Sequence, residues 1–454
     1  NLLRGEPGSS VLVEFERDTP EAPTTPDGLF RVELKRKQVR MSDVKLVTYL
    51  GERRDVGYIN LAGFNALAGR QVANAILGLR AHAPPGGLRG IVLDLRGNPG
   101  GLLEGAVEVA TALVPRESPV VSVAGRPGRG EEVTYASASD PVRPLSTPLV
   151  LLVNRGTASA AEIVAGAVQD LDAGVVMGSE RSFGKGVVQK VEELKNSGAS
   201  LKFTIARYYT PSGRCIQSVK YTADGEPEAA AEPAAAPRRG AKGGKEVAES
   251  ERKEFRTRAG RVVRDGGGIE PDVKIARKEM STVEAALLTQ GAFFDFAGEW
   301  AKVNGGSAPK PGVVTPEVLR QFKAFVMARS GQGKLSVESP FTPQLDALAD
   351  ALTAAGLATA AEDVKRAKVD AHDGLLASLD AHSAEIADTL ETSILSRFLP
   401  SSAVLDAAVR RDSQVQEAVS LLLKDNGATY AQLLQADAAP GGEVASASPA
   451  PPQT

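Results

Sequence analysis

The chain contains 454 residues, of which 42% are hydrophobic and 24% are charged, and its formal net charge is -3 at pH 7. This length exceeds what one hydrophobic core usually organises, so we expect a globular protein with more than one domain. The small net charge gives no argument for binding to nucleic acid or anionic membranes and leaves membrane association open, and the single cysteine, Cys215, excludes an internal disulfide.

The first segment reads as a strand followed by a linker. Residues 1–17 resemble the last part of a PDZ domain, a module that binds a free C-terminus by adding it to a sheet as a strand. A plain amphipathic strand is the alternative interpretation. Residues 18–27 are rich in proline and threonine and predict a linker, so we expect the next domain to cover residues 28–276. No apolar run in the chain is long enough to predict a membrane span.

A glycine-rich turn follows the first strongly apolar strand. Residues 90–95 read Gly-Ile-Val-Leu-Asp-Leu, and residues 96–102 read Arg-Gly-Asn-Pro-Gly-Gly-Leu. Adjacent glycines after a buried strand allow backbone amides to point at a ligand without a side chain in the way. A purely structural turn is the alternative interpretation.

A second apolar strand ends in a turn that carries Ser159. Residues 148–153 are almost purely apolar, and residues 158–170 place apolar side chains on one face of a predicted helix. Ser159 is therefore expected in the first helical turn. Free backbone amides and the positive end of the helix dipole at that place would stabilise a negatively charged intermediate. A simple helix cap is the alternative role for Ser159.

Lys185 lies in the next segment and is flanked by glycines. A lysine acts as a general base only in its neutral form, which burial in apolar surroundings favours. Phe183 and Val187 would supply such surroundings, and Gln189 could accept a hydrogen bond from the amine and orient it toward Ser159. A solvated surface charge is the alternative interpretation of this lysine.

The three histidines argue against the commoner catalytic triad. His82 lies in a predicted loop, and His372 and His382 lie in a separate helical region, so a Ser-His-Asp arrangement is not expected. One cysteine and three scattered histidines also give no zinc-ligand spacing. Of these hydrolytic sites, the sequence favours a Ser/Lys pair.

The rest of the chain divides into an insert, a helical region and a tail. Residues 224–253 are of low complexity and predict a flexible insert in the preceding domain. Residues 282–435 carry apolar residues at helical spacing and predict a helical domain that caps the site, mediates self-association or covers its neighbour. Residues 436–454 predict a disordered tail.

Six segments, taken together and in order, resemble the C-terminal processing peptidases, also called tail-specific proteases. These segments are residues 57–64, 93–101, 154–163, 183–189, 207–214 and 268–273. The resemblance covers most of residues 1–275. It implies an α/β catalytic domain of the crotonase/Clp-protease-like spiral type, with a truncated N-terminal PDZ remnant before it and an all-α C-terminal region after it.

The resemblance also implies catalytic roles. Ser159 would be the nucleophile, Lys185 the general base and Gln189 the residue that orients this lysine. The backbone amides of Gly101 and Ala160 would form the oxyanion hole. The implied reaction is endopeptidase cleavage near protein C-termini through an acyl-enzyme, with neither a metal nor an organic cofactor.

By the same resemblance, Asp170 would support the site. The implied substrates are proteins or peptides with apolar C-terminal tails and not nucleic acid, with a homo-oligomer as one option. The implied compartment is the bacterial periplasm or cell envelope, or alternatively the thylakoid lumen.

Two departures from the family pattern concern the site. Ala161 stands where the family usually has serine, and residues 179–182 are one residue longer than usual. This loop must therefore bulge if Lys185 is to reach Ser159. Two other functions stay open: a non-catalytic ligand-binding or scaffold module of the same fold, and a crotonase-like acyl-CoA enzyme.

Overall fold

The computed structural model describes residues 3–16, 29–38, 42–125, 132–194, 198–218, 247–276 and 280–436. The chain divides into two units, Asn1–Asp43 and Val44–Thr454. In the first unit, β1 (Ser10–Glu16) pairs antiparallel with β2 (Leu29–Lys35). The domain boundary expected at residue 28 therefore lies inside this unit, because β2 continues the pairing of β1. The linker predicted at residues 18–27 lies outside the described residues.

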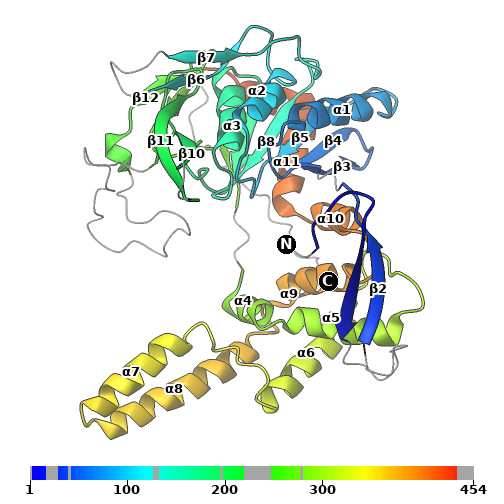
Figure 1. Cartoon of the computed structure of the whole chain (residues 1–454), viewed down its shortest axis with the longest axis vertical. Coiled ribbons are helices and arrows are strands. Elements are labelled where there is room, and N and C mark those ends of the chain that lie inside the picture. The colour runs from blue at the N-terminus through cyan, green and yellow to red at the C-terminus, as the bar shows by residue number, and fades with distance from the viewer. Residues whose placement is uncertain are drawn as a thin grey trace, which may run out of the picture. The chain divides into compact units, whose positions relative to one another are not determined.

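The second unit is built on a six-stranded sheet with the order β14-β9-β8-β5-β4-β3 (Figure 1). All neighbouring strands are parallel except β3 and β4, which are antiparallel. The strands are β3 (Val44–Leu50), β4 (Val56–Leu61), β5 (Gly90–Asp94), β8 (Leu149–Val153), β9 (Val175–Gly178) and β14 (Val273–Lys274). Every residue of β5 and β8 is buried, which confirms the two apolar strands expected there and is typical of a parallel sheet covered on both faces.

Side chains that alternate along these strands face two different helical layers. Ile91 and Leu93 pack into the core formed with α1 (Ala68–Ala81), α2 (Leu103–Thr111) and α3 (Ala160–Asp170). Val92 faces the other core, to which α11 (Ser413–Leu423) contributes Val415 and Leu422. After the helical region the chain thus returns to the six-stranded sheet, and α11 covers the second face of that sheet.

A separate antiparallel sheet with the order β10-β11-β6-β7 carries the segment after Lys185. Its strands are β6 (Pro119–Ala124), β7 (Val133–Ala136), β10 (Val187–Glu193) and β11 (Ser200–Tyr209), and β12 (Glu254–Arg256) and β13 (Val262–Arg264) form a small ribbon. Most of the predicted insert, residues 224–246, lies outside the described residues. Its end at residue 253 was predicted wrongly, because Val247 is buried and its N–H donates to Ser218 O at 3.0 Å, and the short helix η1 (Glu249–Glu251) follows.

Residues 280–436 form helices joined by turns, so the C-terminal region is all-helical. Besides α11, these are α4 (Thr282–Thr289), α5 (Ala292–Asn304), α6 (Pro316–Gly331), α7 (Thr342–Ala354), α8 (Ala358–Ala377), α9 (Ser383–Leu395), α10 (Ser401–Val409), η2 (Lys424–Gly427) and α12 (Ala428–Leu433). Phe293 and Phe322 stack at 5.0 Å in the core to which α4, α5, α6, α8 and α9 contribute. None of the described helices combines the length and apolar character that crossing a bilayer requires. Of the predicted tail, residues 437–454 lie outside the described residues.

Candidate active site

Ser159 occupies a strained turn between β8 and α3. It is the N-cap residue of α3, and its φ of 56° lies in the left-handed region that residues other than glycine rarely adopt. Such conformations cost about 1–3 kcal/mol and persist where surrounding contacts enforce them. Thr157 supplies two of these contacts: its Oγ1 donates to Leu95 O at 2.8 Å and accepts from Asn154 N at 3.0 Å.

A buried carboxylate joins this turn to the lysine segment. Oε2 of Glu162 accepts hydrogen bonds from the backbone N–H groups of Ser159 and Lys185, each at 2.8 Å. Its Oε1 accepts from Ser182 Oγ at 2.5 Å and from Gly184 N at 2.6 Å. Glu162 is 0% exposed; burial raises the pKa of its carboxyl, and the four donated hydrogen bonds oppose that shift. One side chain therefore clamps two segments that are far apart in the sequence.

Glu162 is a residue that the sequence analysis did not single out. The signal was the spacing Ser159-Ala-Ala-Glu162, which matches the capping box that starts many helices. The same clamp also holds the last residue of the loop at residues 179–182. Ser182 is buried and its Oγ accepts from Ile269 N at 2.6 Å, so the loop is anchored three residues before Lys185.

The side chains of Lys185 and Gln189 are both at least partly open to solvent. Lys185 is half-buried, and Gln189 is exposed on β10, the edge strand of its sheet. The pairing of β10 with β11 shifts register between Val188 and Gln189, a bulge of the kind that often redirects side chains beside active sites. Among the described residues, Gln189 makes no side-chain hydrogen bond to Lys185.

The glycine-rich turn lies directly against Ser159. Gly100 has a φ of 95°, and a Cβ built on it would lie 2.8 Å from Ser159 Cβ and 2.9 Å from Ala160 N. Only glycine fits at this approach. Asn98 holds the turn, since its Oδ1 accepts from Gly100 N at 2.9 Å and its O accepts from Ala158 N at 2.9 Å. Gly101 follows and forms an isolated parallel bridge with the chain at Phe64, which extends the strand pairing beyond β4 and β5.

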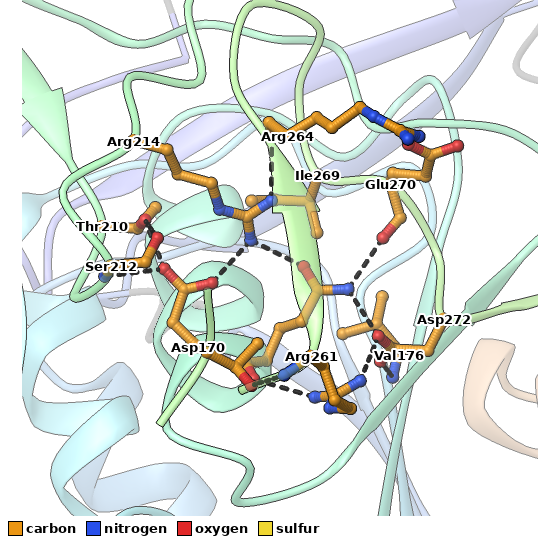
Figure 2. Close-up of polar contacts among 12 residues, drawn as sticks. Asp170, Val176, Thr210, Ser212, Arg214, Arg261, Arg264, Ile269, Glu270 and Asp272 are labelled. Carbon is orange, nitrogen blue, oxygen red and sulfur yellow. Dashed lines mark hydrogen bonds and ion pairs between the residues drawn. The ribbon is translucent and has the colours of Figure 1, made fainter. Parts of the chain in front are cut away.

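Asp170 lies at the opposite end of α3 from Ser159. The helix has 11 residues, so roughly 16 Å separates its two ends. Figure 2 shows Asp170 in a network with Arg214, whose Nη2 donates to Oδ1 at 2.7 Å while both side chains are 0% exposed. Thr210 Oγ1 and Ser212 N also donate to Asp170 Oδ2. Asp170 can therefore act on Ser159 only through the position of the helix.

A second part of this network links two of the sequence motifs. Gln169 accepts from Arg214 Nη2 at 2.6 Å and donates to Glu270 O at 2.8 Å and to Asp272 Oδ1 at 2.9 Å. Arg261, which stands beside Asp272 in Figure 2, pairs with Asp272 as well. The motifs at residues 207–214 and 268–273 are thus both fastened to the C-terminal end of α3.

Comparison with known protein families identifies the domain that holds this geometry. Residues 55–226 match the model of peptidase family S41. This part of the chain belongs to peptidase family S41. Residues 283–422 match a second model, described as the C-terminal helical domain of a probable PDZ-protease. Ser159 and Lys185 lie in the S41 domain, and the family indicates a serine-type peptidase.

Several relatives of the S41 domain are named as C-terminal processing proteases. A chloroplastic C-terminal processing peptidase of Tetradesmus obliquus is 35% identical over 234 residues, which cover 49% of this chain and 47% of that protein. A carboxyl-terminal-processing protease of Synechocystis sp. is 37% identical over 220 residues, covering 48% and 47%. The chain thus spans about half the length of the curated relatives it matches. The solved structure of a photosystem II D1 C-terminal processing protease is 35% identical and covers 47% of this chain and 54% of that one, with a TM-score of 0.34.

Outside the S41 domain, the helical region contains a Ser–His–Glu arrangement that the sequence analysis did not expect. His372 Nε2 lies 2.6 Å from Ser330 Oγ, and its Nδ1 lies 2.5 Å from Glu338 Oε2. Ser330, however, is in the last turn of α6, where the helix dipole is negative and disfavours an oxyanion. The next amides are occupied, since Gln332 N donates to Ala328 O and Gly333 N to Ser330 O. This arrangement has a nucleophile and a base but no pair of amides to stabilise an intermediate.

Proposed function

We propose that the chain is a serine endopeptidase that cleaves proteins near their C-termini through Ser159 and Lys185. The observation that carries the proposal is the Glu162 carboxylate. One of its oxygen atoms, Oε2, binds both the Ser159 turn and the Lys185 segment. The names of two of the relatives, a C-terminal processing peptidase and a carboxyl-terminal-processing protease, support the substrate class.

The proposed reaction has two steps. Ser159 Oγ attacks the carbonyl carbon of the scissile bond while neutral Lys185 Nζ takes the hydroxyl proton. The backbone amides of Gly101 and Ala160 stabilise the tetrahedral oxyanion, and the Lys185 ammonium returns the proton to the leaving amine as the C–N bond breaks. Lys185 then takes a proton from water as the water oxygen attacks the ester carbon, and it gives that proton to Ser159 Oγ as the C–O bond to serine breaks. This releases the new C-terminal carboxylic acid, which ionises, and restores the Ser159 hydroxyl and the neutral amine.

Two other residues have supporting roles in this proposal. Gln189 orients Lys185 once substrate is bound, since catalytic hydrogen bonds are often loose in the free enzyme. Asp170 keeps α3, and with it the amide of Ala160, in place through its buried pair with Arg214. We propose no metal and no organic cofactor in either step.

We further propose that the S41 domain has the crotonase/Clp-protease-like spiral arrangement and that residues 1–17 are the end of a PDZ domain. Such a domain would present an apolar C-terminal tail by strand addition. The proposed compartment is the bacterial periplasm or cell envelope, or the thylakoid lumen. Self-association into a homo-oligomer stays a prediction.

The test is cleavage of an unfolded protein, casein, followed by mass spectrometry. We expect the parent chain to cleave casein and the Ser159→Ala and Lys185→Ala variants to be inactive. Lys274→Ala, which removes a half-exposed lysine that pairs with Glu270, serves as the matched control and should remain active. Cleavage that survives Ser159→Ala would contradict the proposal, and an inactive parent would favour a binding module.

A further inference from the structure

Arg96 joins the glycine-rich turn of the S41 domain to the C-terminal helical region. It lies between β5 and Gly97, the first glycine of the turn. On one side its Nε donates to Asp94 Oδ1 at 3.0 Å and its Nη2 to Asp94 Oδ2 at 2.7 Å. On the other side Nη1 lies 2.9 Å from Asp412 Oδ2 and donates to Gln414 Oε1 at 2.9 Å. One side chain therefore connects segments matched by two separate family models.

The Asp94 side of this connection is held by buried contacts. Asp94 is 2% exposed and also accepts hydrogen bonds from Tyr58 OH at 2.7 Å and from Arg96 N at 3.0 Å. Burial, together with the charge of Asp94, raises the pKa of Tyr58, so its hydroxyl remains a donor. The backbone of Arg96 and the inner edge of its guanidinium, formed by Nε and Nη2, are thereby attached to the end of β5.

The helical side of the connection is equally well defined. Asp412 is the N-cap of α11, and its Oδ1 accepts from Val415 N at 3.1 Å. Gln414 donates from Nε2 to Ala276 O at 3.0 Å. The helix itself packs so closely on the sheet that a Cβ built on Gly90 would lie 2.7 Å from Leu422. The position of α11 is therefore fixed relative to β5.

A cavity lies beside the outer edge of the Arg96 guanidinium, the edge whose Nη1 contacts Asp412 and Gln414. Its volume is about 530 Å³, and it is lined by Arg96 with Asn154, Ser179, Asp388, Thr392 and Asp412 among others. Without Asp412 and Gln414, the outer edge of the guanidinium would face this cavity. The side chain would then be oriented by Asp94 alone.

A short stretch of backbone, from Gly97 to Gly100, links Arg96 to the candidate active site. Gly97 N donates to Asn154 Oδ1 at 2.9 Å, and the same oxygen accepts from Gly156 N at 3.0 Å in the turn that precedes Ser159. Gly100, three residues on, is packed against Ser159. Because catalytic groups misplaced by 1 Å lose much of their effect, small shifts of this turn have large consequences.

We infer that Asp412 and Gln414 are positioning residues for the peptidase reaction. By holding Arg96, they set the place of the turn whose Gly101 amide receives the oxyanion. The inference rests on the proposed function and deepens it, because it makes two residues of the C-terminal helical region necessary for full turnover.

The test compares Asp412→Ser with the parent chain on a fluorogenic peptide. Serine keeps the N-cap of α11 but is too short to reach Arg96, so the helix is retained while the contact is lost. We expect kcat to fall about tenfold with KM unchanged, a part of the ~100- to 1,000-fold loss that follows removal of one oxyanion donor. The affinity of a peptide boronate, whose adduct with Ser159 is tetrahedral, should fall by the same factor. Gln414→Ala should change both quantities in the same direction.

The matched control is Asp406→Ser. Asp406 pairs with Arg410 at 2.9 Å on α10 and is as exposed as Asp412, but it does not contact Arg96. Unchanged kcat in Asp412→Ser, or an equal loss in Asp406→Ser, would overturn the inference while Ser159-dependent cleavage still upheld the proposed function. Cleavage that survives Ser159→Ala would remove both.

Discussion

The backbone amides of Ser159 and Lys185 donate to the same oxygen atom, Glu162 Oε2, at equal distances of 2.8 Å. The relative position of the two proposed catalytic residues thus depends on one buried side chain. Since Ser182 and Gly184 bind the other oxygen, both oxygens of the carboxylate are in use.

We expect Glu162→Gln to remove most of the activity. The amide nitrogen of glutamine cannot accept hydrogen bonds, so two of the four donors are left without a partner. Each unsatisfied buried donor costs about 1–3 kcal/mol, so the thermal midpoint should fall as well. Glu284→Gln is the matched control, because Glu284 is also buried at the third position of a helix, α4, after Ser281 as N-cap. It should lower stability without lowering kcat per folded molecule; equal kcat values in the two variants would contradict the role of Glu162.

The same carboxylate predicts a pH dependence. Burial raises the pKa of Glu162 above its ordinary value of 4.5, so it takes up a proton at a higher pH than an ordinary glutamate. Because the protonated carboxyl cannot accept all four hydrogen bonds, activity should decrease as the pH is lowered. Its effect on stability has the opposite sign: the folded chain binds this proton more tightly than the unfolded chain, so the group adds to the free energy of unfolding as pH falls toward 4.5.

Measuring kcat and the thermal midpoint over the same pH range, down to pH 4.5, distinguishes the effect of Glu162 protonation on activity from its effect on stability. We expect kcat of the parent chain to decline before the fold is lost. The residual activity of Glu162→Gln should lack this decline. A parent chain whose kcat stays constant down to pH 4.5, the ordinary glutamate value, would show that Glu162 does not titrate there.

Gly100→Ala should abolish activity, because the new methyl group would lie 2.8 Å from Ser159 Cβ. Gly97→Ala is the control in the same turn. Gly97 also has a positive φ, 69°, but no atom lies within 4 Å of the Cβ position, so only the backbone cost of about 1–2 kcal/mol applies. Casein cleavage rates of the two purified variants check this. Similar losses in both would mean that backbone strain, and not contact with the nucleophile, is responsible.

The buried pair of Asp170 and Arg214 should matter for stability as well as for activity. Asp170→Asn leaves the Arg214 guanidinium buried without its counter-charge, which typically costs about 3–5 kcal/mol. Asp363→Asn, at an exposed pair with Arg366, should leave the midpoint of urea unfolding nearly unchanged. Equal midpoints for both variants would mean that the Asp170 network carries little of the stability of the domain.

The sequence predicted those parts of the site that depend on local patterns. Apolar runs located β5 and β8, and the Ala-rich segment after them placed Ser159 at the start of α3. Glu162 was missed because a glutamate in a helix is usually solvated, and its burial depends on the distant Lys185 segment. The contact of Arg96 with Asp412 spans 316 positions, a separation that no local pattern reports.

Fluorophosphonate labelling should distinguish Ser159, the proposed nucleophile, from Ser330, which lies beside His372. We expect the reagent to modify Ser159 and not Ser330, because α3 offers its amide end to the adduct whereas α6 offers its carbonyl end. Ser330 contacts His372, whose other ring nitrogen contacts Glu338, so it has a base, but the described residues around it offer no amide pair for the phosphonyl oxygen. Mass spectrometry of digested, labelled chain identifies the modified serine. Label should disappear in Ser159→Ala and persist in His372→Gln; label found on Ser330 would mean that the base alone activates this serine and that the helix-end argument is wrong.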